Sequence, residues 1–298
     1  MKVSIITAFY HGQQYMEGYI NCIEKNMQAL DEADEIEVVL VNDSPEDRLE
    51  VGDGGARYIT VITNEKNSGI HQSRVNGLKA ATGDYIMFLD QDDLLADDAI
   101  AKFLARIRDL KSGGNRVDVI VANALLEQPD GRELTLYRTD YHKKCVGNYE
   151  TYLTVGTQII SPGQCLVRKG IIPFFWMEHI LQNNGSDDFF LWILLLAEGV
   201  KFEYLDEILY RHVYTAKNLS ADTTVTDDSN YEFIDYLADF PNIEQEDIFK
   251  LHSMIAYKAQ FRGSKVVGKA AASLANLGIF AKNVAYKKKT DTKLGFNR

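Results

Sequence analysis

The sequence has few cysteines and no long apolar run. Its three cysteines, Cys22, Cys145 and Cys165, are widely spaced and form no CxxC pair, which argues against a disulfide framework and a zinc cage. The longest apolar runs, such as residues 189–197, fall well short of the roughly 20 residues that a membrane-spanning helix needs. We therefore expect a protein of the reducing cytoplasm that does not cross a membrane.

Several sequence motifs are also missing. No GxGxxG follows the first apolar run and no GxxxxGK[ST] occurs, which disfavours a dinucleotide-dependent enzyme and a P-loop protein. The apolar run at residues 3–9 is followed by no small-residue cleavage site, so we interpret it as a first strand and not as a leader. No internal repeat or low-complexity tract is present.

Positive charge is scarce except at one end. The formal net charge of the 298-residue chain is -11, which argues against general binding of nucleic acid. Residues 262–298 contain nine Lys or Arg and one acid, so the rest of the chain sums to -19. The mixture of basic and apolar side chains in this segment suits binding to an anionic membrane surface. The alternative is a basic helix that is simply exposed to solvent.

The first part of the chain alternates short β-rich runs with amphipathic segments. The runs predict strands at residues 3–8, 37–41, 58–63, 85–89 and 117–121. This alternation predicts an α/β fold with a mainly parallel, Rossmann-like sheet flanked by helices, whose ligands bind beyond the carboxyl ends of the strands.

Later segments suggest a helical extension. Residues 128–132 predict a hairpin turn, and Ser186 begins a helix that ends before Gly199. Strand-like runs follow at residues 201–204 and 208–210. Helical patterns then occupy residues 231–237, 244–261 and 265–282. We place a boundary near residue 220, between a domain of residues 1–220 and a helical region of residues 221–298 that is basic at its end.

Three carboxylates follow an almost wholly apolar run. Asp90, Asp92 and Asp93 stand directly after residues 85–89, where unpaired they would repel one another. A divalent cation resolves this conflict, because hard oxygen ligands bind magnesium or manganese together with substrate phosphates. The alternative is that the cluster only caps a helix from about Ala96 and interacts with its dipole.

A second acidic pair precedes an apolar helix. Asp187 and Asp188 lie behind a flexible NNGS stretch, where one of them is able to face a cleft and act as a general base. Acids in a first helical turn are also common for dipole reasons alone, so a purely structural role is the alternative.

Three further side chains are candidates for a ligand site at the carboxyl ends of the predicted strands. Asp43 ends another buried run and is suited to accept hydrogen bonds from a base or ribose. Arg74, on a helix that starts near Gly69, is expected to point toward an anionic ligand or else to be a surface charge. His212 follows a strand-like run and is a candidate nitrogen ligand, although a lone histidine is often structural.

Five ordered segments together resemble glycosyltransferase family 2, the inverting nucleotide-sugar transferases of GT-A fold. The resemblance covers roughly residues 2–220. The segments are VSIITAFYHG, VVLVNDSPED, NEKNSGIHQSRVNGLKAATGDYIMFLDQDD, SDDFFLWILLLAEG and YLDEILYR. Two departures are that Asn42 stands where Asp is common and that His212 directly follows Arg211.

The resemblance implies a role for each candidate. The nucleotide-sugar contacts it implies are Ala8, Phe9, Asp43, Arg74, Asp90 and Gln91. The DxD motif of the family corresponds to Asp90 and Asp92, and the resemblance implies that Asp92 and Asp90 contact the metal. It also implies that His212 is a further metal ligand and that Asp93 supports the site. Asp188 inherits the role of catalytic base, and Asp187 stands beside it where Glu is commoner.

The implied activity is a metal-dependent, hexosyltransferase-type transfer with Mn²⁺ or Mg²⁺. The donor would be a nucleotide sugar, by family habit a UDP-sugar, and the acceptor a glycan or lipid-linked hydroxyl in bacterial-type surface polysaccharide synthesis. No QxxRW motif of processive synthases is present. The expected location is the cytoplasm, at the inner face of the membrane if residues 262–298 bind lipid. The alternatives are a non-catalytic nucleotide-sugar-binding module and a nucleotidyltransferase.

Overall fold

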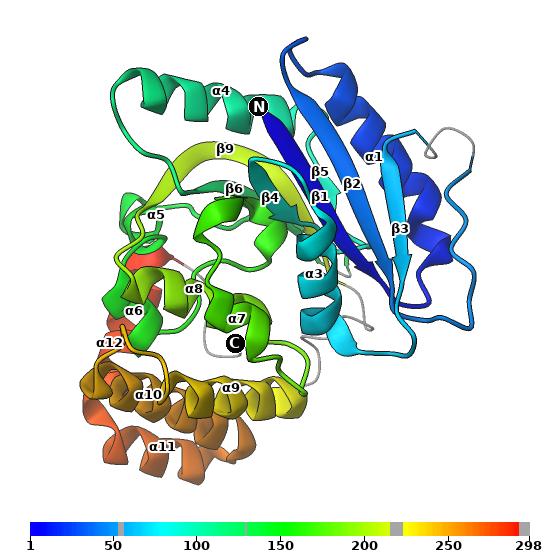
Figure 1. Cartoon of the computed structure of the whole chain (residues 1–298). Coiled ribbons are helices and arrows are strands. Elements are labelled where there is room, and N and C mark those ends of the chain that lie inside the picture. The colour runs from blue at the N-terminus through cyan, green and yellow to red at the C-terminus, as the bar shows by residue number, and fades with distance from the viewer. Residues whose placement is uncertain (53–56, 129, 215–222, 292–298) are drawn as a thin grey trace. The chain divides into compact units, whose positions relative to one another are not determined.

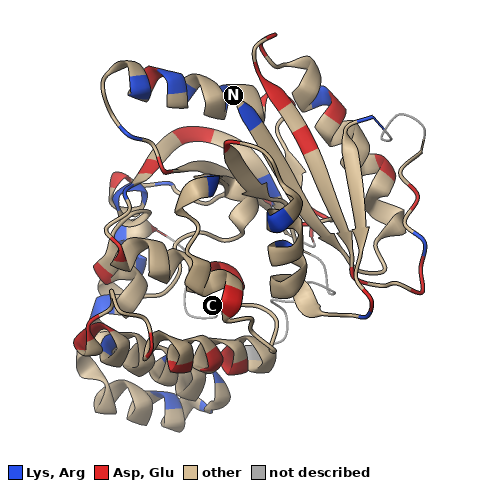
Figure 2. Ribbon diagram, viewed as in Figure 1, with Lys and Arg blue, Asp and Glu red and all other residues tan. Residues whose placement is uncertain are grey.

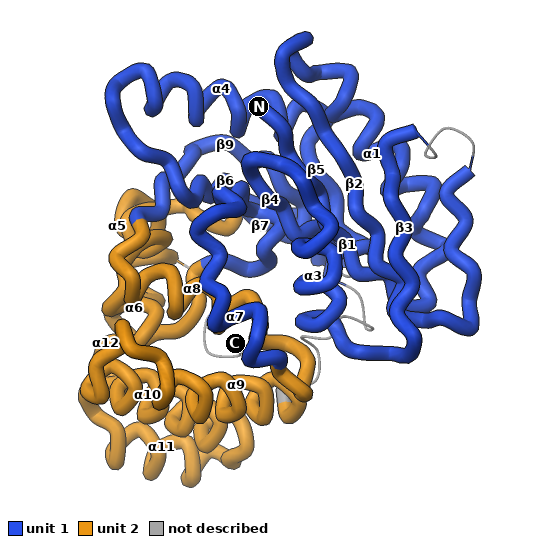
Figure 3. The backbone as a smooth tube through the Cα atoms, viewed as in Figure 1, with its two compact units in different colours: residues 1–135, 159–180, 201–218 blue, residues 136–158, 181–200, 219–298 orange. Residues whose placement is uncertain are grey.

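The computed structural model describes residues 1–52, 57–128, 130–214 and 223–291. The chain forms two compact units that alternate along the sequence (Figure 3). Unit 1 comprises residues 1–135, 159–180 and 201–218, and unit 2 comprises residues 136–158, 181–200 and 219–298. The last crossing between units lies close to residue 220, but two earlier segments also belong to unit 2. No helix among the described residues is long and apolar enough to cross a membrane.

Unit 1 is built on one sheet with strand order β3-β2-β1-β4-β8-β6-β9-β5, and β7 pairs with β6. The strands are β1 (Lys2–Phe9), β2 (Glu35–Asn42), β3 (Ile59–Thr63), β4 (Tyr85–Phe88), β5 (Leu94–Leu95), β6 (Val119–Glu127), β7 (Glu133–Thr135), β8 (Cys165–Arg168) and β9 (Phe202–Val213). β1 to β4 are mutually parallel, as are β6 and β9, whereas β5, β7 and β8 pair antiparallel with their neighbours. The mainly parallel α/β sheet predicted from the sequence is confirmed.

Helices cover both faces of the first strands (Figure 1). Tyr19 of α1 (Met16–Gln28) contacts Thr7 and Phe9 on one face of β1. On the other face, a Cβ at Gly77 of α3 (Gly69–Ala80) would lie 2.3 Å from the Ile6 side chain. Because successive strand residues point to opposite faces, these contacts place α1 and α3 on opposite sides of the sheet. Glycine at 77 permits the close approach of α3.

Five further helices of unit 1 are present among the described residues. They are η1 (Gln13–Tyr15), α4 (Ala99–Ser112), η2 (Pro162–Gln164), η3 (Lys169–Ile171) and α7 (Phe174–Glu178). The cluster of residues 90–93 does not cap α4, because β5 separates the two and Asp98 occupies the N-cap position. The capping alternative for this cluster is therefore wrong.

Unit 2 is helical. Its helices are α5 (Asp140–Cys145), α6 (Tyr149–Thr154), α8 (Asp187–Ala197), α9 (Thr223–Leu237), α10 (Gln245–Gly263), α11 (Val266–Ala275) and α12 (Leu277–Thr290). α8 begins and ends as the sequence predicts, and its apolar side chains are buried on every side. Phe189 and Phe190 of α8 both contact Phe233 of α9. A helix that is apolar all round is typical of such a central position.

The helical pattern predicted for residues 265–282 forms two helices, because the chain breaks between α11 and α12. Asn276 has a non-helical backbone with φ -125° and ψ 44°. Its backbone N–H and its side-chain amide both donate to the carbonyl of Ala272, which ends α11. Asparagine competes well for such local backbone hydrogen bonds, and so it favours the end of a helix.

Candidate active site

The carboxyl ends of β1, β2 and β4 form one edge of the sheet in unit 1. β1 pairs in parallel with β2 on one side and with β4 on the other. The segments that follow these strands carry Tyr10 and His11, Asp43, and Asp90 with its neighbours. Such an edge is where open α/β sheets bind their ligands.

Asp90 is held by two partners from distant parts of the chain. A guanidinium nitrogen of Arg74 donates to its Oδ1 at 2.6 Å, and the hydroxyl of Ser161 donates to Oδ2 at 3.1 Å. Burial raises the pKa of Asp90, while the charge of Arg74 opposes that rise. The Arg74 side chain, predicted to meet an anionic ligand, is itself buried and orients Asp90. The structure therefore brings these two predicted residues together.

Asp93, which lies directly before β5, and His212 of β9 form a buried pair. His212 Nδ1 lies 3.0 Å from Asp93 Oδ1, and the same carboxylate accepts from Val213 N at 3.1 Å and from the Tyr210 hydroxyl. Nε2 of His212 is buried without a hydrogen-bond partner among the described residues. Histidines that bind metals commonly donate their other ring N–H to a carboxylate in this way. The unsatisfied nitrogen therefore fits a metal ligand.

Asp92 lies half-buried beside this pair. Burial and the negative charges of Asp93 and Asp90 raise its pKa to about 6. A nearby cation would favour the ionised carboxylate, as expected for a metal ligand. The structure does not gather Asp90, Asp92 and His212 into a ready three-ligand cluster among the described residues. A magnesium-type ion needs only one or two carboxylates when substrate phosphates complete its shell.

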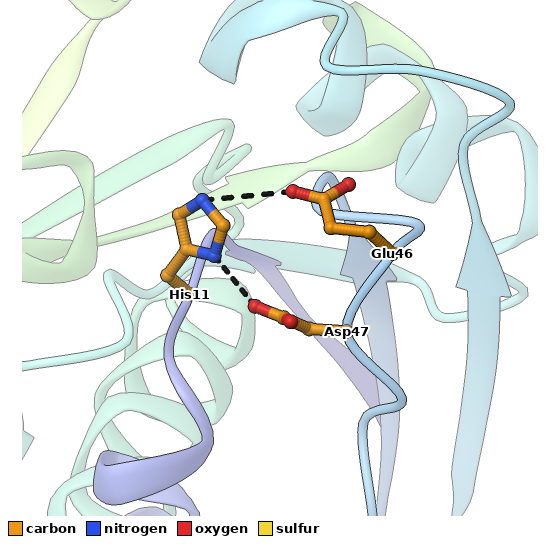
Figure 4. A group of neighbouring side chains, drawn as sticks. All are labelled: His11, Glu46 and Asp47. Carbon is orange, nitrogen blue, oxygen red and sulfur yellow. Dashed lines mark hydrogen bonds and ion pairs between the residues drawn. The ribbon is translucent and has the colours of Figure 1, made fainter.

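Among the described residues, one exposed group does bring three ligand types together, namely His11, Glu46 and Asp47 (Figure 4). Nδ1 of His11 lies 2.6 Å from Asp47, whereas its other nitrogen, Nε2, lies 3.7 Å from Glu46. The two carboxylates thus face different ring nitrogens, which is the geometry of hydrogen bonds and not of one shared ion. This group joins the segment after β1 to the segment after β2.

Tyr10 is a residue that the sequence analysis missed. Its side chain is 48% exposed, whereas that of Phe9 is buried against Tyr19. A contact through the Phe9 side chain is thereby ruled out, and its backbone carbonyl instead accepts from Asp43 N at 2.7 Å. The signal was present, because strand alternation puts Tyr10 on the same face as Ala8 and turns Phe9 away. Ala8 is half-buried.

Gln91 holds Tyr10 in place. Its amide oxygen accepts from Tyr10 N at 3.1 Å and its amide nitrogen donates to Tyr10 O at 3.3 Å. A Cβ at Gly12 would lie 2.1 Å from the same amide oxygen, so glycine is required for Gln91 to reach across. The predicted nucleotide-sugar residue Gln91 therefore connects the segments after β1 and β4.

Asp43 is buried and binds the start of α3. Its Oδ1 accepts from Asn64 Nδ2 at 2.7 Å and Ser68 N at 2.8 Å, and its Oδ2 accepts from Gly69 N at 2.9 Å. These bonds satisfy donors at a helix N-terminus. Asp43 thus has a structural role at the edge of the sheet, and contact with a nucleoside stays a prediction for it.

The second acidic pair lies in unit 2, at the first turn of α8. Asp187 is buried, whereas Asp188 is half-buried and its Oδ1 accepts from Phe189 N at 2.7 Å. The preceding residues are fixed by α9, since Glu232 accepts hydrogen bonds from the backbone of Gln182 and Asn183. Asp188 is therefore the more accessible acid of the pair and sits on an ordered helix end.

The chain belongs to glycosyltransferase family 2, whose model, "Glycosyl transferase family 2", matches residues 4–172. A curated relative is "Minor teichoic acid biosynthesis protein GgaB" of Bacillus subtilis, 29% identical over 39% of this chain and 13% of the relative. The matches to curated relatives span between 13% and 57% of each relative's own length.

Two solved structures have a similar fold. S. aureus TarS 1-349 in complex with UDP-GlcNAc has a TM-score of 0.61 at 17% identity, over 97% of this chain and 82% of that one. The mannosyltransferase PcManGT from Pyrobaculum calidifontis, in complex with GDP-Man and Mn²⁺, has a TM-score of 0.51 at 14% identity, over 97% and 83%. The GT-A-like α/β fold with a helical C-terminal region is thereby confirmed.

Proposed function

We propose that this protein is an inverting, metal-dependent glycosyltransferase that moves a sugar from a nucleotide sugar to an acceptor hydroxyl. The observation that carries the proposal is the buried pair of Asp93 and His212, in which Nε2 of His212 has no hydrogen-bond partner among the described residues. The leaving nucleoside diphosphate carries negative charge, which a cation held at this site would neutralise, and membership of the family agrees with this chemistry.

Asp92 and His212 are the residues that would hold the ion, and Asp90 would face it as well. A bound Mn²⁺ or Mg²⁺ supplies positive charge that neutralises the diphosphate as it leaves. The chain contributes the orientation: Asp93 fixes the His212 ring, and Arg74 with Ser161 fixes Asp90. These supports come from separate segments, so the ligands are positioned before the substrate arrives.

The nucleoside would lie at the ends of β1 and β2. The exposed Tyr10 ring offers a surface for stacking on the base, and Ala8 leaves room beside it. Gln91 fixes the Tyr10 backbone from the segment after β4. The family resemblance adds Asp43 and the backbone of Phe9 to these contacts. The site is thereby suited to one nucleoside diphosphate.

Asp188 is proposed as the general base that removes the proton of the acceptor hydroxyl, with Asp187 beside it. The hydroxyl oxygen then forms the new bond to the anomeric carbon as the bond to the diphosphate breaks. A single displacement inverts the anomeric carbon, so an α-linked donor gives a β-linked product. A product with the retained anomer, identified by NMR, would refute this mechanism.

The relatives support a narrower substrate class. The UDP-GlcNAc in TarS supports a UDP-sugar as donor, and the Mn²⁺ in PcManGT supports a divalent ion. The similarity to GgaB, named for minor teichoic acid biosynthesis, supports an acceptor that belongs to a cell-surface polymer or its lipid-linked precursor.

The test is a screen of nucleotide sugars for hydrolysis with Mn²⁺ or Mg²⁺. We expect turnover of one nucleotide sugar that is lost in EDTA and in Asp92→Ala. Asp97→Ala, an exposed acid close by in sequence, is the matched control and is expected to stay active. Equal metal-dependent turnover in Asp92→Ala would contradict the metal assignment. Binding without any turnover or transfer would indicate a non-catalytic module, and pyrophosphate release from a nucleoside triphosphate would indicate a nucleotidyltransferase.

A further inference from the structure

Helix α11 presents its apolar side chains to solvent. Val266, Val267 and Leu274 are 84%, 82% and 69% exposed, while Ala272 is buried. Val267, Ala271 and Leu274 are spaced by four and three residues, so they share one face of the helix. Both Ala270 and Ala271 are exposed as well. The outward face of α11 is therefore wholly apolar.

The inward side of α11 is the more polar one. Lys269 lies with its Nζ 5.1 Å from the centre of the Phe261 ring of α10, and the Ser273 hydroxyl is 3.5 Å from that of Tyr257. Ser273 also donates to the Lys269 carbonyl at 2.8 Å. These contacts fix how the helix is rotated against α10. The exposed valines and leucine are thus a consequence of packing and not of a frayed end.

Helix α12 likewise exposes apolar side chains and buries polar ones. Leu277 and Val284 are exposed, whereas the polar Asn283 and Thr290 are buried. Asn283 donates to the carbonyls of Thr154 and Ile279, and the Tyr286 hydroxyl donates to Gln158 at 2.6 Å. Polar side chains therefore attach α12 to the rest of unit 2, while Leu277 and Val284 lie exposed on a helix whose lysines are exposed as well.

This apolar surface lies among positive charges. Residues 263–290 include six lysines and no acid, in a chain whose net charge is -11. Lys282 pairs with Glu150 at 2.8 Å, but Lys265 and Lys288 have no acidic partner in the described part of the chain. Figure 2 shows basic residues without an acidic one along α11. Exposed apolar side chains next to lysines match the acyl and headgroup layers of an anionic bilayer.

We propose that the outward faces of α11 and α12 bind the surface of a membrane that contains anionic lipids. A second copy of the chain is the less suitable occupant, because a self-complementary contact would bring the lysines of both copies together and they would repel. A lipid surface instead offers negative charge and an apolar layer at once. The inference is independent of the transferase reaction.

The test is flotation of the full-length protein with phosphatidylcholine vesicles, with and without phosphatidylglycerol. We expect binding only to the anionic vesicles and a loss of at least about tenfold in partitioning for the double variant V267N/L274N. Phe249→Asn is the matched control, because Phe249 is 71% exposed on α10 and lies outside the proposed surface. It is expected to bind like the unmodified protein.

A second pair of variants tests the charge. Lys265→Gln and Lys288→Gln should each lower binding to anionic vesicles by about fivefold. Added salt should also weaken this binding, because it screens the attraction between lysines and anionic lipids. Absence of binding to anionic vesicles, or equal binding by V267N/L274N, overturns the proposal. A lipid-free dimer that V267N/L274N converts to a monomer, measured by light scattering, also overturns it in favour of self-association.

Discussion

The two units distribute polar and apolar side chains in opposite ways. In unit 1 several buried polar side chains lie at the carboxyl ends of the strands and bond to one another, as Asp43 does with Asn64 and Asp93 with His212. In unit 2 a lysine, Lys258, is buried inside the helical bundle, while Val266 and Val267 of α11 are exposed. Unit 1 follows the usual pattern of a ligand-binding sheet, whereas α11 and α12 of unit 2 expose apolar side chains that helices usually bury.

This difference leads us to expect that the two units meet their partners in different ways. Burying linked polar groups costs free energy unless they are fully bonded, so proteins retain them mainly where they orient a ligand. Exposed apolar faces are instead retained where another surface covers them. We therefore expect unit 1 to be sensitive to changes of single polar atoms and the outer helices of unit 2 to be sensitive to loss of apolar area.

The largest effect is expected from Asp188→Asn, which tests whether unit 2 contributes a catalytic residue in addition to its exposed apolar surface. Removal of a general base should lower the transfer rate by about 10³-fold while donor binding is kept. Asp235→Asn, an exposed acid on α9, is the matched control. Rates would be measured with donor and acceptor both saturating. Full activity of Asp188→Asn would leave unit 2 without a catalytic residue and refute the assignment.

A smaller effect is expected from Asp93→Asn in unit 1. The amide keeps the size of the side chain but removes the charge that orients the His212 ring. Loss of such a supporting carboxylate should weaken metal affinity by about 10–100-fold, measured by titration of Mn²⁺ in the presence of UDP. Asp97→Asn should bind the ion normally. Unchanged affinity in Asp93→Asn, with the fold intact by circular dichroism, would show that the pair is only structural.

The first strands of unit 1 were predictable because their signal is local. Apolar runs predict β1, β2 and β4 to within about two residues, and the acids that follow β2 and β4 are evident from the same pattern. The partners of those acids were not predictable, because His212 lies far from Asp93 in the chain and no local pattern marks the pairing. Phe9 ends β1 and faces Tyr19, whereas Tyr10, which follows it, lies on the same face as Ala8, a difference that strand alternation alone predicts.

In unit 2 the sequence predicted helices but not their rotation. The pattern of residues 265–282 contains enough apolar positions for a helix, yet it does not say which face is buried. That choice depends on Tyr257 and Phe261 of α10, which hold the polar side of α11. The break at Asn276 likewise depends on a side-chain hydrogen bond that composition alone does not reveal.

A third prediction concerns the buried lysine of unit 2. Burial, and next the charge of Arg262, lower the pKa of Lys258 to about 7. Between about pH 7 and the ordinary lysine value of 10.5 the unfolded chain binds more protons than the folded one, so stability should rise with pH across this window. Lys258→Met should abolish that rise and stabilise the fold by about 2 kcal/mol at pH 7, measured by urea unfolding. Lys265→Met, an exposed lysine, should leave the slope unchanged, and a flat profile in the unmodified protein would contradict the prediction.

The smallest effect is expected from Tyr10→Ala, which asks whether the edge of unit 1 binds the base by an aromatic contact. Stacking of a base on an aromatic side chain contributes about 1–3 kcal/mol, so we expect KM for the donor to rise by about tenfold with little change in kcat. Tyr10→Phe should retain the original KM, because the ring and not the hydroxyl provides the stacking surface. Tyr141→Ala removes a similarly exposed ring from unit 2 and should leave KM unchanged. An equal rise in both alanine variants would mean that the effect comes from lost stability, and then the contrast between the two units would not extend to recognition of the donor.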